Sequence, residues 1–240
     1  MKILVAVMGC EFHAENGIQQ MSRETWVQDV DKIGDFKFFI GRGNLSLKDD
    51  EHRVDAIDDK EHLLFKVVEI LKYALENNYD MIFKLDNDTY VNVDAVSKTI
   101  PGYAGYDYIG VPVGVPREPY GQTNVYSFLQ GSATWLSARA AAIVIKEAIP
   151  SMIRIMPEAM KFNGLICPYS HSEDLWVAQV LMPEQQLNIL ADYRYSNGDL
   201  TFHYALPKEG NKFKDWMFKL HESRHDINKM MMIHQSRKEI

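Results

Sequence analysis

The sequence predicts an α/β protein with a mostly parallel central sheet and helices on both of its faces. Residues 2–8 form a nearly continuous apolar run, which is typical of a strand buried on both sides in a parallel sheet. An amphipathic helix over 60–77 precedes another apolar run at 81–83. Strands and helices that alternate in this order favour parallel strand pairing, with the helices packed against the sheet.

The first part of the chain contains further strands and helices. A polar loop is expected at 9–17, and a helix containing 21–27 follows it. Aromatic and β-branched residues predict a second strand at 36–40. The segment 49–59 is rich in aspartate, and it is interpreted as a solvated surface stretch.

The middle of the chain continues this pattern. A strand is predicted at 106–112, a loop rich in glycine and proline at 113–123, and a short strand at 133–137. Ser137 is expected to cap a helix over 138–148, because serine side chains accept hydrogen bonds at helix starts.

The last part of the chain predicts a helix over 172–181, a late strand over 200–205 and a helix from 212 to the end. No internal repeat and no linker rich in glycine, proline or serine divides the chain. Residues 1–240 are therefore expected to form one domain.

The composition excludes several classes of function. A net charge of −7 argues against binding to nucleic acid or to anionic membranes, because such binding requires a basic surface. Two cysteines, Cys10 and Cys167, are too few for a disulfide framework and favour a reducing compartment. No apolar segment is long enough to span a bilayer. We therefore expect a soluble, cytoplasmic protein without an integral membrane segment.

Two carboxylates follow the apolar run at 81–83. Asp86 and Asp88 are two residues apart, so in a strand both would lie on the same face. Neighbouring carboxylates repel each other unless a cation lies between them, which indicates a hard divalent metal. The spacing alone leaves an alternative open, a turn in which Asp86, Asn87 and Asp88 cap a helix beginning near Val93.

Five separated segments carry a further pattern: Arg23-Glu24-Thr25-Trp26, then Asp58 with Leu63 and Lys66, then Lys84 to Asn92, then Gly131 with Leu136 and Ser137, and finally Glu173-Asp174-Leu175. In this order they resemble motifs of the family 31 glycosyltransferases, the β1,3-galactosyl- and N-acetylglucosaminyltransferases that include the Fringe-like enzymes. The chain departs from the family at Lys60, His62 and Asn87, where the family has tyrosine, asparagine and aspartate.

The resemblance implies a GT-A fold, with about 1–100 as the nucleotide-sugar-binding half and about 101–240 as the acceptor half with a C-terminal helix. It implies inverting transfer from a UDP-sugar, usually with Mn²⁺ or Mg²⁺, to a hydroxyl of a glycan, glycolipid or glycoprotein. Galactose, N-acetylglucosamine or N-acetylgalactosamine and a β1,3 linkage are expected. The family's eukaryotic members usually carry a membrane anchor and paired cysteines, so a bacterial or viral origin is expected for this chain.

The resemblance also implies which residues hold the donor. Asp88 is expected to bind the metal, with His203 as a second ligand. Asp86 and Asn87 would support the metal or contact the ribose, and asparagine in place of aspartate removes one negative charge. For His203, the alternative is a histidine whose hydrogen bonds are satisfied within a strand.

The base expected from the resemblance is Asp174, with Glu173 beside it. An inverting transferase requires one base that deprotonates the attacking hydroxyl. Without the resemblance, these two acids at a helix start would be favoured by the helix dipole alone.

Several other residues are candidates for donor binding. Arg23 is expected to contact the nucleotide, Lys84 or Lys66 to neutralise phosphate, and Gly131 to shape the donor pocket, with ordinary salt bridges as the alternative for the three cations. Two other functions remain open, a non-catalytic chaperone or binding module on the same fold, and a metal-dependent nucleotidyl- or phosphotransferase.

Overall fold

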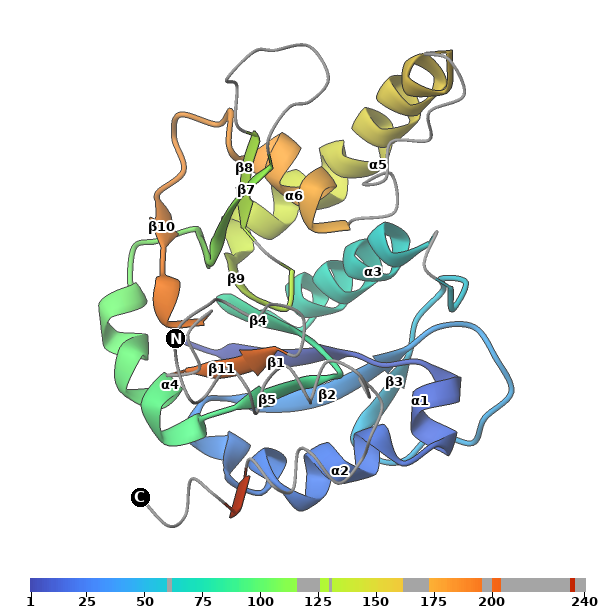
Figure 1. Ribbon diagram of the computed structural model, residues 1–240, viewed down its shortest axis with the longest axis vertical. Coiled ribbons are helices and arrows are strands. Elements are labelled where there is room, and N and C mark those ends of the chain that lie inside the picture. Colours follow the sequence, from blue (N-terminus) through green and yellow to red (C-terminus); the bar gives the residue numbers. More distant parts are fainter. Residues whose placement is uncertain are drawn as a thin grey trace.

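A seven-stranded sheet with helices on both faces forms the centre of the molecule (Figure 1). The structure is a computed structural model that describes residues 1–59, 62–115, 126–129, 131–161, 173–195, 200–203 and 234–235. The strands of the sheet, in spatial order, are β10 (Ile189–Ala191), β6 (Tyr108–Gly110), β9 (Ala133–Ser137), β4 (Met81–Asp86), β1 (Ile3–Met8), β2 (Asp35–Ile40) and β3 (Glu51–Arg53). Two antiparallel pairs join β5 (Thr89–Val91) to β11 (Thr201–His203) and β7 (Pro112–Val115) to β8 (Tyr126–Leu129).

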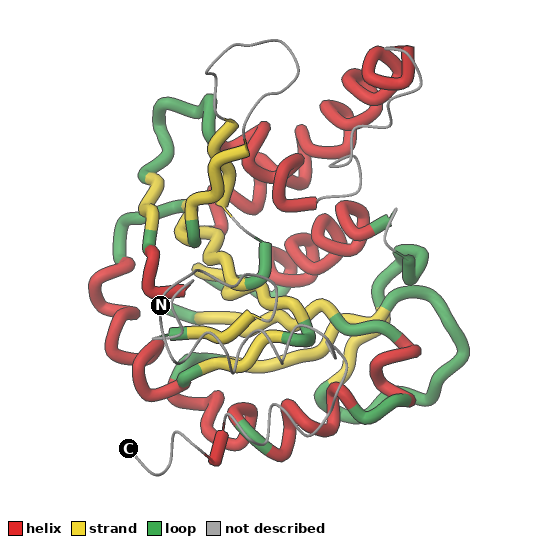
Figure 2. The backbone as a smooth tube through the Cα atoms, in the orientation of Figure 1, coloured by secondary structure: helices red, strands yellow, loops and turns green. Residues whose placement is uncertain are grey.

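Helices cover both sides of this sheet, and the tube view shows their distribution (Figure 2). On one side lie α3 (Leu63–Glu76), α5 (Ala138–Lys161) and α6 (Glu173–Leu181). On the other side lie η1 (Trp26–Lys32), α4 (Val93–Thr99) and η2 (Ile100–Tyr103). The remaining helices of the described chain are α1 (Glu11–Glu15), α2 (Ile18–Glu24) and η3 (Tyr193–Tyr195).

The pairing of the strands confirms the expected mostly parallel sheet. Neighbouring strands run parallel from β4 to β3 and between β10 and β6, whereas β9 is antiparallel to both β4 and β6. The antiparallel direction of β9 brings its first residues to the carboxyl end of β4. Leu85 pairs with Ala133, and the Asp86 N–H donates to the Ser132 carbonyl over 3.2 Å.

The apolar run of β1 is buried on both sides, as its composition predicts. Leu4, Ala6 and Met8 pack in the core beneath α3, α5 and α6. The alternate residues of β1 pack in the second core, which includes Trp26 and Val96. The period of two along a strand therefore divides β1 between two hydrophobic cores.

Several segments differ from their predictions. The loop expected at 9–17 contains the short helix α1, and the acidic stretch 49–59 is not fully solvated, because it contains strand β3 and the buried Glu51. The predicted helix from 212 lies outside the described residues except for 234–235. In the parts of the chain that the structure describes, no helix is both long and apolar enough to cross a bilayer.

The two caps named in the sequence have different outcomes. Ser137 Oγ accepts from the Ala140 N–H at 3.1 Å, which confirms its predicted role at the start of α5. At α4 the side chain of Asn92 accepts from the Ala95 N–H. The alternative in which Asp86, Asn87 and Asp88 cap this helix is therefore wrong.

The cap gives a first testable prediction. Asn92→Ala removes the acceptor at the start of α4 and should lower the free energy of unfolding by about 1 kcal/mol. Ser97→Ala, in the same helix and exposed at its hydroxyl, should change it by less than about 0.5 kcal/mol. Urea titration of both variants measures the difference, and equal values would exclude a role for the cap.

Candidate active site

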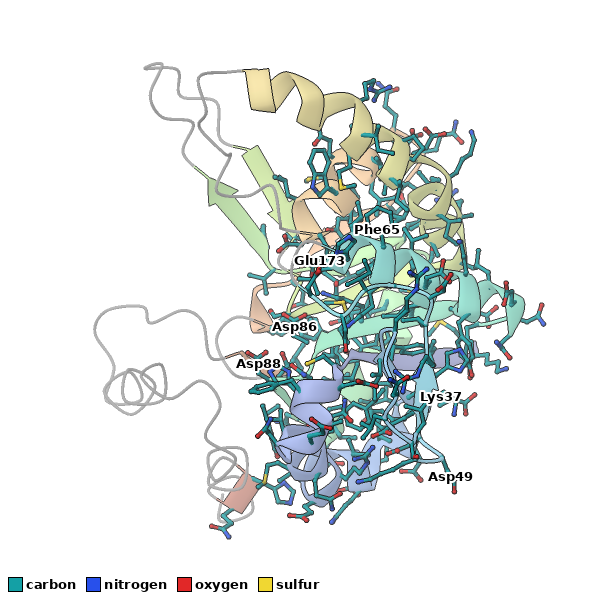
Figure 3. All side chains as sticks on the ribbon, turned by 90° about the vertical axis from the view of Figure 1, so that its right-hand side faces the viewer. Lys37, Asp49, Phe65, Asp86, Asp88 and Glu173 are labelled. Carbon is teal, nitrogen blue, oxygen red and sulfur yellow. The ribbon has the colours of Figure 1, made fainter. Side chains whose placement is uncertain are left out.

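Lys84 and Asp86 of strand β4 lie on the same side of the sheet. Ile82 packs in the core beneath α3, α5 and α6, so alternation places Lys84 and Asp86 on that side as well. Asn87 and Asp88 form the turn between β4 and β5 and are mostly buried. Figure 3 shows Asp86, Asp88 and Glu173 along one edge of the described molecule, away from Lys37 and Asp49.

Lys84 occupies a position where the strand pattern would place an apolar residue. Its ammonium lies 2.7 Å from the Gly131 carbonyl, 2.7 Å from Glu173 Oε1 and 3.1 Å from Asp86 Oδ1, and its side chain is only 3% exposed. Burial lowers the pKa of Lys84, but the charges of Asp86 and Glu173 outweigh burial and hold the pKa above its ordinary value. Lys84 is therefore protonated at neutral pH.

Asp174 lies at the start of α6, next to this charge cluster. Its Oδ2 accepts from the Gly131 N–H at 3.0 Å, and its Oδ1 accepts from the Leu175 N–H at 2.8 Å. Burial, followed by the negative charge of Glu173, raises the pKa of Asp174 to about 6, against the opposing effects of the Gly131 N–H and Lys84. The carboxylate is thus more basic than an ordinary aspartate and is held in one orientation.

A cavity of about 340 Å³ opens beside the β4–β5 turn. It is lined by residues from four separate segments, among them His13, Asp58, Lys66, Asp86, Asp88 and Glu173. Glu173 also lines a small adjoining space together with Lys84, Gly131 and Asp174. The structure therefore brings together the acidic turn and the acidic start of α6, which the sequence places about 85 residues apart.

Another part of the cavity wall depends on a second buried lysine. Lys66 Nζ donates to the Gly9 carbonyl at 2.8 Å and forms an ion pair with Asp58, and its side chain is 3% exposed. The other oxygen of Asp58 accepts from the Glu11 N–H at 2.9 Å. Lys66 and Asp58 thus fix the segment that follows β1.

Sequence reasoning missed His13 as a residue of this site. His13 lies in α1, lines the cavity, and contacts the Asn87 amide nitrogen through its Nδ1. The available signal was the position of 9–17 after the first strand, because ligands of α/β proteins bind at the carboxyl ends of the strands.

The β4–β5 turn carries carboxylates of the kind that bind divalent cations. Among the described residues, no group of three or more histidine, cysteine, aspartate or glutamate side chains is placed to hold a metal. Mg²⁺ characteristically uses one or two carboxylates together with substrate phosphates, and it does not need a cage of protein ligands. Asp88 and Asp86 fit a cation shared with phosphate in this way. The register of β11 places His203 opposite Thr89, the residue after Asp88.

Other candidate residues lie apart from the cavity. Arg23 forms ion pairs with Asp50 at 2.7 Å and Glu51 at 2.6 Å, so its guanidinium stabilises the β3 edge of the sheet. These bonds match the salt-bridge alternative for Arg23, and its contact with a nucleotide stays a prediction.

Comparisons with known proteins bear on the fold. No protein-family model and no curated protein matches the chain. Among solved structures, it is similar to the crystal structure of a glycosyltransferase involved in the glycosylation of the major capsid of PBCV-1. The TM-score is 0.51 and the identity 14%, over 97% of this chain and 100% of the other. The likeness confirms the expected α/β, GT-A-like fold, and membership of family 31 stays a prediction.

Gly131 gives the prediction for this site. A Cβ at this position would lie 2.7 Å from Glu173 Oε1 and 3.0 Å from Lys84 Nζ, and neither atom can retreat without breaking the buried ion pair. Gly131→Ala should therefore lower the free energy of unfolding by about 1–3 kcal/mol.

Gly102→Ala is the matched control, because a Cβ there meets nothing within 4 Å. It should leave stability unchanged or raise it by up to about 1 kcal/mol. Thermal and urea unfolding measure both variants. If Gly131→Ala were as stable as Gly102→Ala, the packing around the ion pair would be looser than the structure has it.

Proposed function

We propose that this protein is a metal-dependent inverting glycosyltransferase. It moves galactose, N-acetylglucosamine or N-acetylgalactosamine from a UDP-sugar to a hydroxyl of a glycan, glycolipid or glycoprotein, in a β1,3 linkage. One observation carries the proposal: the Asp86–Asp88 turn lines the cavity, and the basic Asp174 carboxylate lines the small adjoining space and is linked to this turn through Gly131 and Lys84. The fold shared with a glycosyltransferase supports glycosyl transfer in general.

The acidic turn would bind the donor through a cation. The cavity carries the carboxylates of Asp58, Asp59, Asp86, Asp88 and Glu173, which would repel a diphosphate. In the proposal Asp88, supported by Asp86 and His203, holds Mn²⁺ or Mg²⁺, which when bound neutralises the charge that develops on the departing UDP. His13 and Asn87 border the same space and would contact the donor.

Asp174 would act as the base. The oxygen of the acceptor hydroxyl attacks the anomeric carbon from the face opposite UDP, the bond to UDP breaks, and the hydroxyl proton passes to Asp174. A pKa of about 6 leaves the carboxylate ionised at neutral pH and makes it a stronger base than an ordinary aspartate. The Gly131 N–H fixes one carboxylate oxygen, which limits the orientations that the other can take.

A direct assay tests this function. The protein is incubated with Mn²⁺ and a panel of UDP-sugars, with and without simple glycoside acceptors, and the release of UDP is measured with and without EDTA. Release that depends on the donor and is lost with EDTA is expected. No release with any donor would favour the alternative, a non-catalytic binding module on the same fold.

Two substitutions separate donor binding from transfer. Asp88→Ala should abolish the metal-dependent part of UDP binding, because it removes the main cation ligand. Asp174→Asn should retain UDP binding within about threefold and lower kcat by about 100-fold or more, since general-base catalysis contributes typically 10²–10⁴-fold. Calorimetric titration with UDP and Mn²⁺ measures binding, and normal transfer by Asp174→Asn would exclude this residue as the base.

The raised pKa of Asp174 predicts the pH dependence. The base must be ionised, so kcat should be constant above pH 7 and fall as pH drops below about 6, approaching tenfold per pH unit. An unperturbed aspartate would place this fall near pH 4. The profile is measured at saturating donor. A fall near pH 6 that persists in the residual activity of Asp174→Asn would assign it to another group.

A further inference from the structure

The hydrogen bonds of Lys84 argue against one role expected for it, the neutralisation of a substrate phosphate. An ammonium group has three N–H donors, and the structure gives Lys84 three acceptors, Asp86, Gly131 and Glu173. No donor is left for a phosphate oxygen of the substrate. Because the side chain is also buried, Lys84 cannot serve as a phosphate-neutralising cation in this arrangement.

The three acceptors belong to three different parts of the site. Asp86 ends β4 and leads into the turn with Asp88, while Glu173 begins α6 beside Asp174. Both backbone polar groups of Gly131 form hydrogen bonds: its carbonyl accepts from Lys84, and its N–H donates to Asp174. One ammonium therefore links the turn that would bind the donor to the carboxylate that would act as base.

We propose that Lys84 is a positioning residue that holds the Asp86–Asp88 turn and the Asp174 carboxylate at a fixed separation, through its bonds to Asp86, Gly131 and Glu173. This inference rests on the proposed function for its catalytic consequence. Donor and acceptor must meet with the hydroxyl between the base and the anomeric carbon, so a small displacement of Asp174 lowers the rate without removing either binding site.

The variants are chosen so that loss of the bond is separated from loss of the fold. Lys84→Met alone leaves the buried Glu173 without its cation, which destabilises the fold for reasons unrelated to catalysis. Lys84→Met combined with Glu173→Gln removes both charges together. Glu173→Gln alone is the matched control, because the Gln amide oxygen still accepts a hydrogen bond from Lys84 while the charge is lost.

Steady-state kinetics give the first readout. The double variant should keep the KM for the UDP-sugar within about threefold of the original protein and lose at least 100-fold in kcat. Glu173→Gln should lose less than tenfold in kcat. A double variant with kcat within threefold of Glu173→Gln would overturn the proposal, and so would a loss confined to KM.

Amide hydrogen exchange of Gly131 gives a second readout that needs no activity. The Gly131 N–H is bonded to Asp174, so it should exchange at least tenfold faster in the double variant and nearly unchanged in Glu173→Gln. Unchanged exchange in the double variant would overturn the positioning role. Faster exchange in a protein that releases no UDP from any donor would instead support the positioning role and contradict the proposed function.

Discussion

The rest of the candidate site depends on the hydrogen bonds and ion pairs of the buried Lys84 ammonium. A lysine at an apolar position of a central strand is costly unless its charge is compensated and its donors are satisfied. Here Asp86 at the end of the same strand and Glu173 in α6 compensate the charge, and the third N–H of the ammonium donates to the Gly131 carbonyl. The elements of the site are consequently held together by the same bonds that make Lys84 tolerable in the core.

Another part of the cavity wall repeats this arrangement. Lys66 is equally buried, donates to the Gly9 carbonyl and pairs with Asp58. In both places an ammonium fixes the backbone of a glycine at the carboxyl rim of the sheet. At Gly131 the absence of a side chain is required, because a Cβ would enter the ion pair. The two lysines thus fix, through ion pairs, three of the acids that line the cavity, Asp58, Asp86 and Glu173.

The sequence was sufficient to predict the fold class, and the roles of the candidate site residues stay predictions. Apolar runs and helical periodicity located β1, β2, β4, β9 and α3, because these elements bury continuous apolar faces. The acids in its first turn located α6. The sequence could not show that β3 lies within the acidic stretch, since the pattern of charges there resembles a solvated loop. The resemblance to family 31 selected Asp88 and Asp174; in the structure Asp88 lines the cavity and Asp174 lines the small adjoining space.

The partners of individual cations could not be predicted, because they come from distant segments. Arg23, expected at the nucleotide, pairs with the β3 edge, and Lys84 pairs with an acid 89 residues later in the chain. Spacing along a sequence carries no record of such contacts. His13 was missed for the same reason, since its neighbour Asn87 is 74 residues away.

The long separation between Lys84 and its partners also bears on how the protein folds. Gly131 lies 47 residues and Glu173 89 residues beyond Lys84, so their bonds close long loops of chain. Non-local contacts of this kind carry a large closure entropy and form slowly. A chain in which β1, β2 and β4 have already paired while α6 is undocked would have Lys84 paired with Asp86 of its own strand but not with Glu173. Docking of α6 adds Glu173 to this ammonium and brings Asp174 to the Gly131 N–H, so that a chain without docked α6 lacks both the second ion pair and the proposed base.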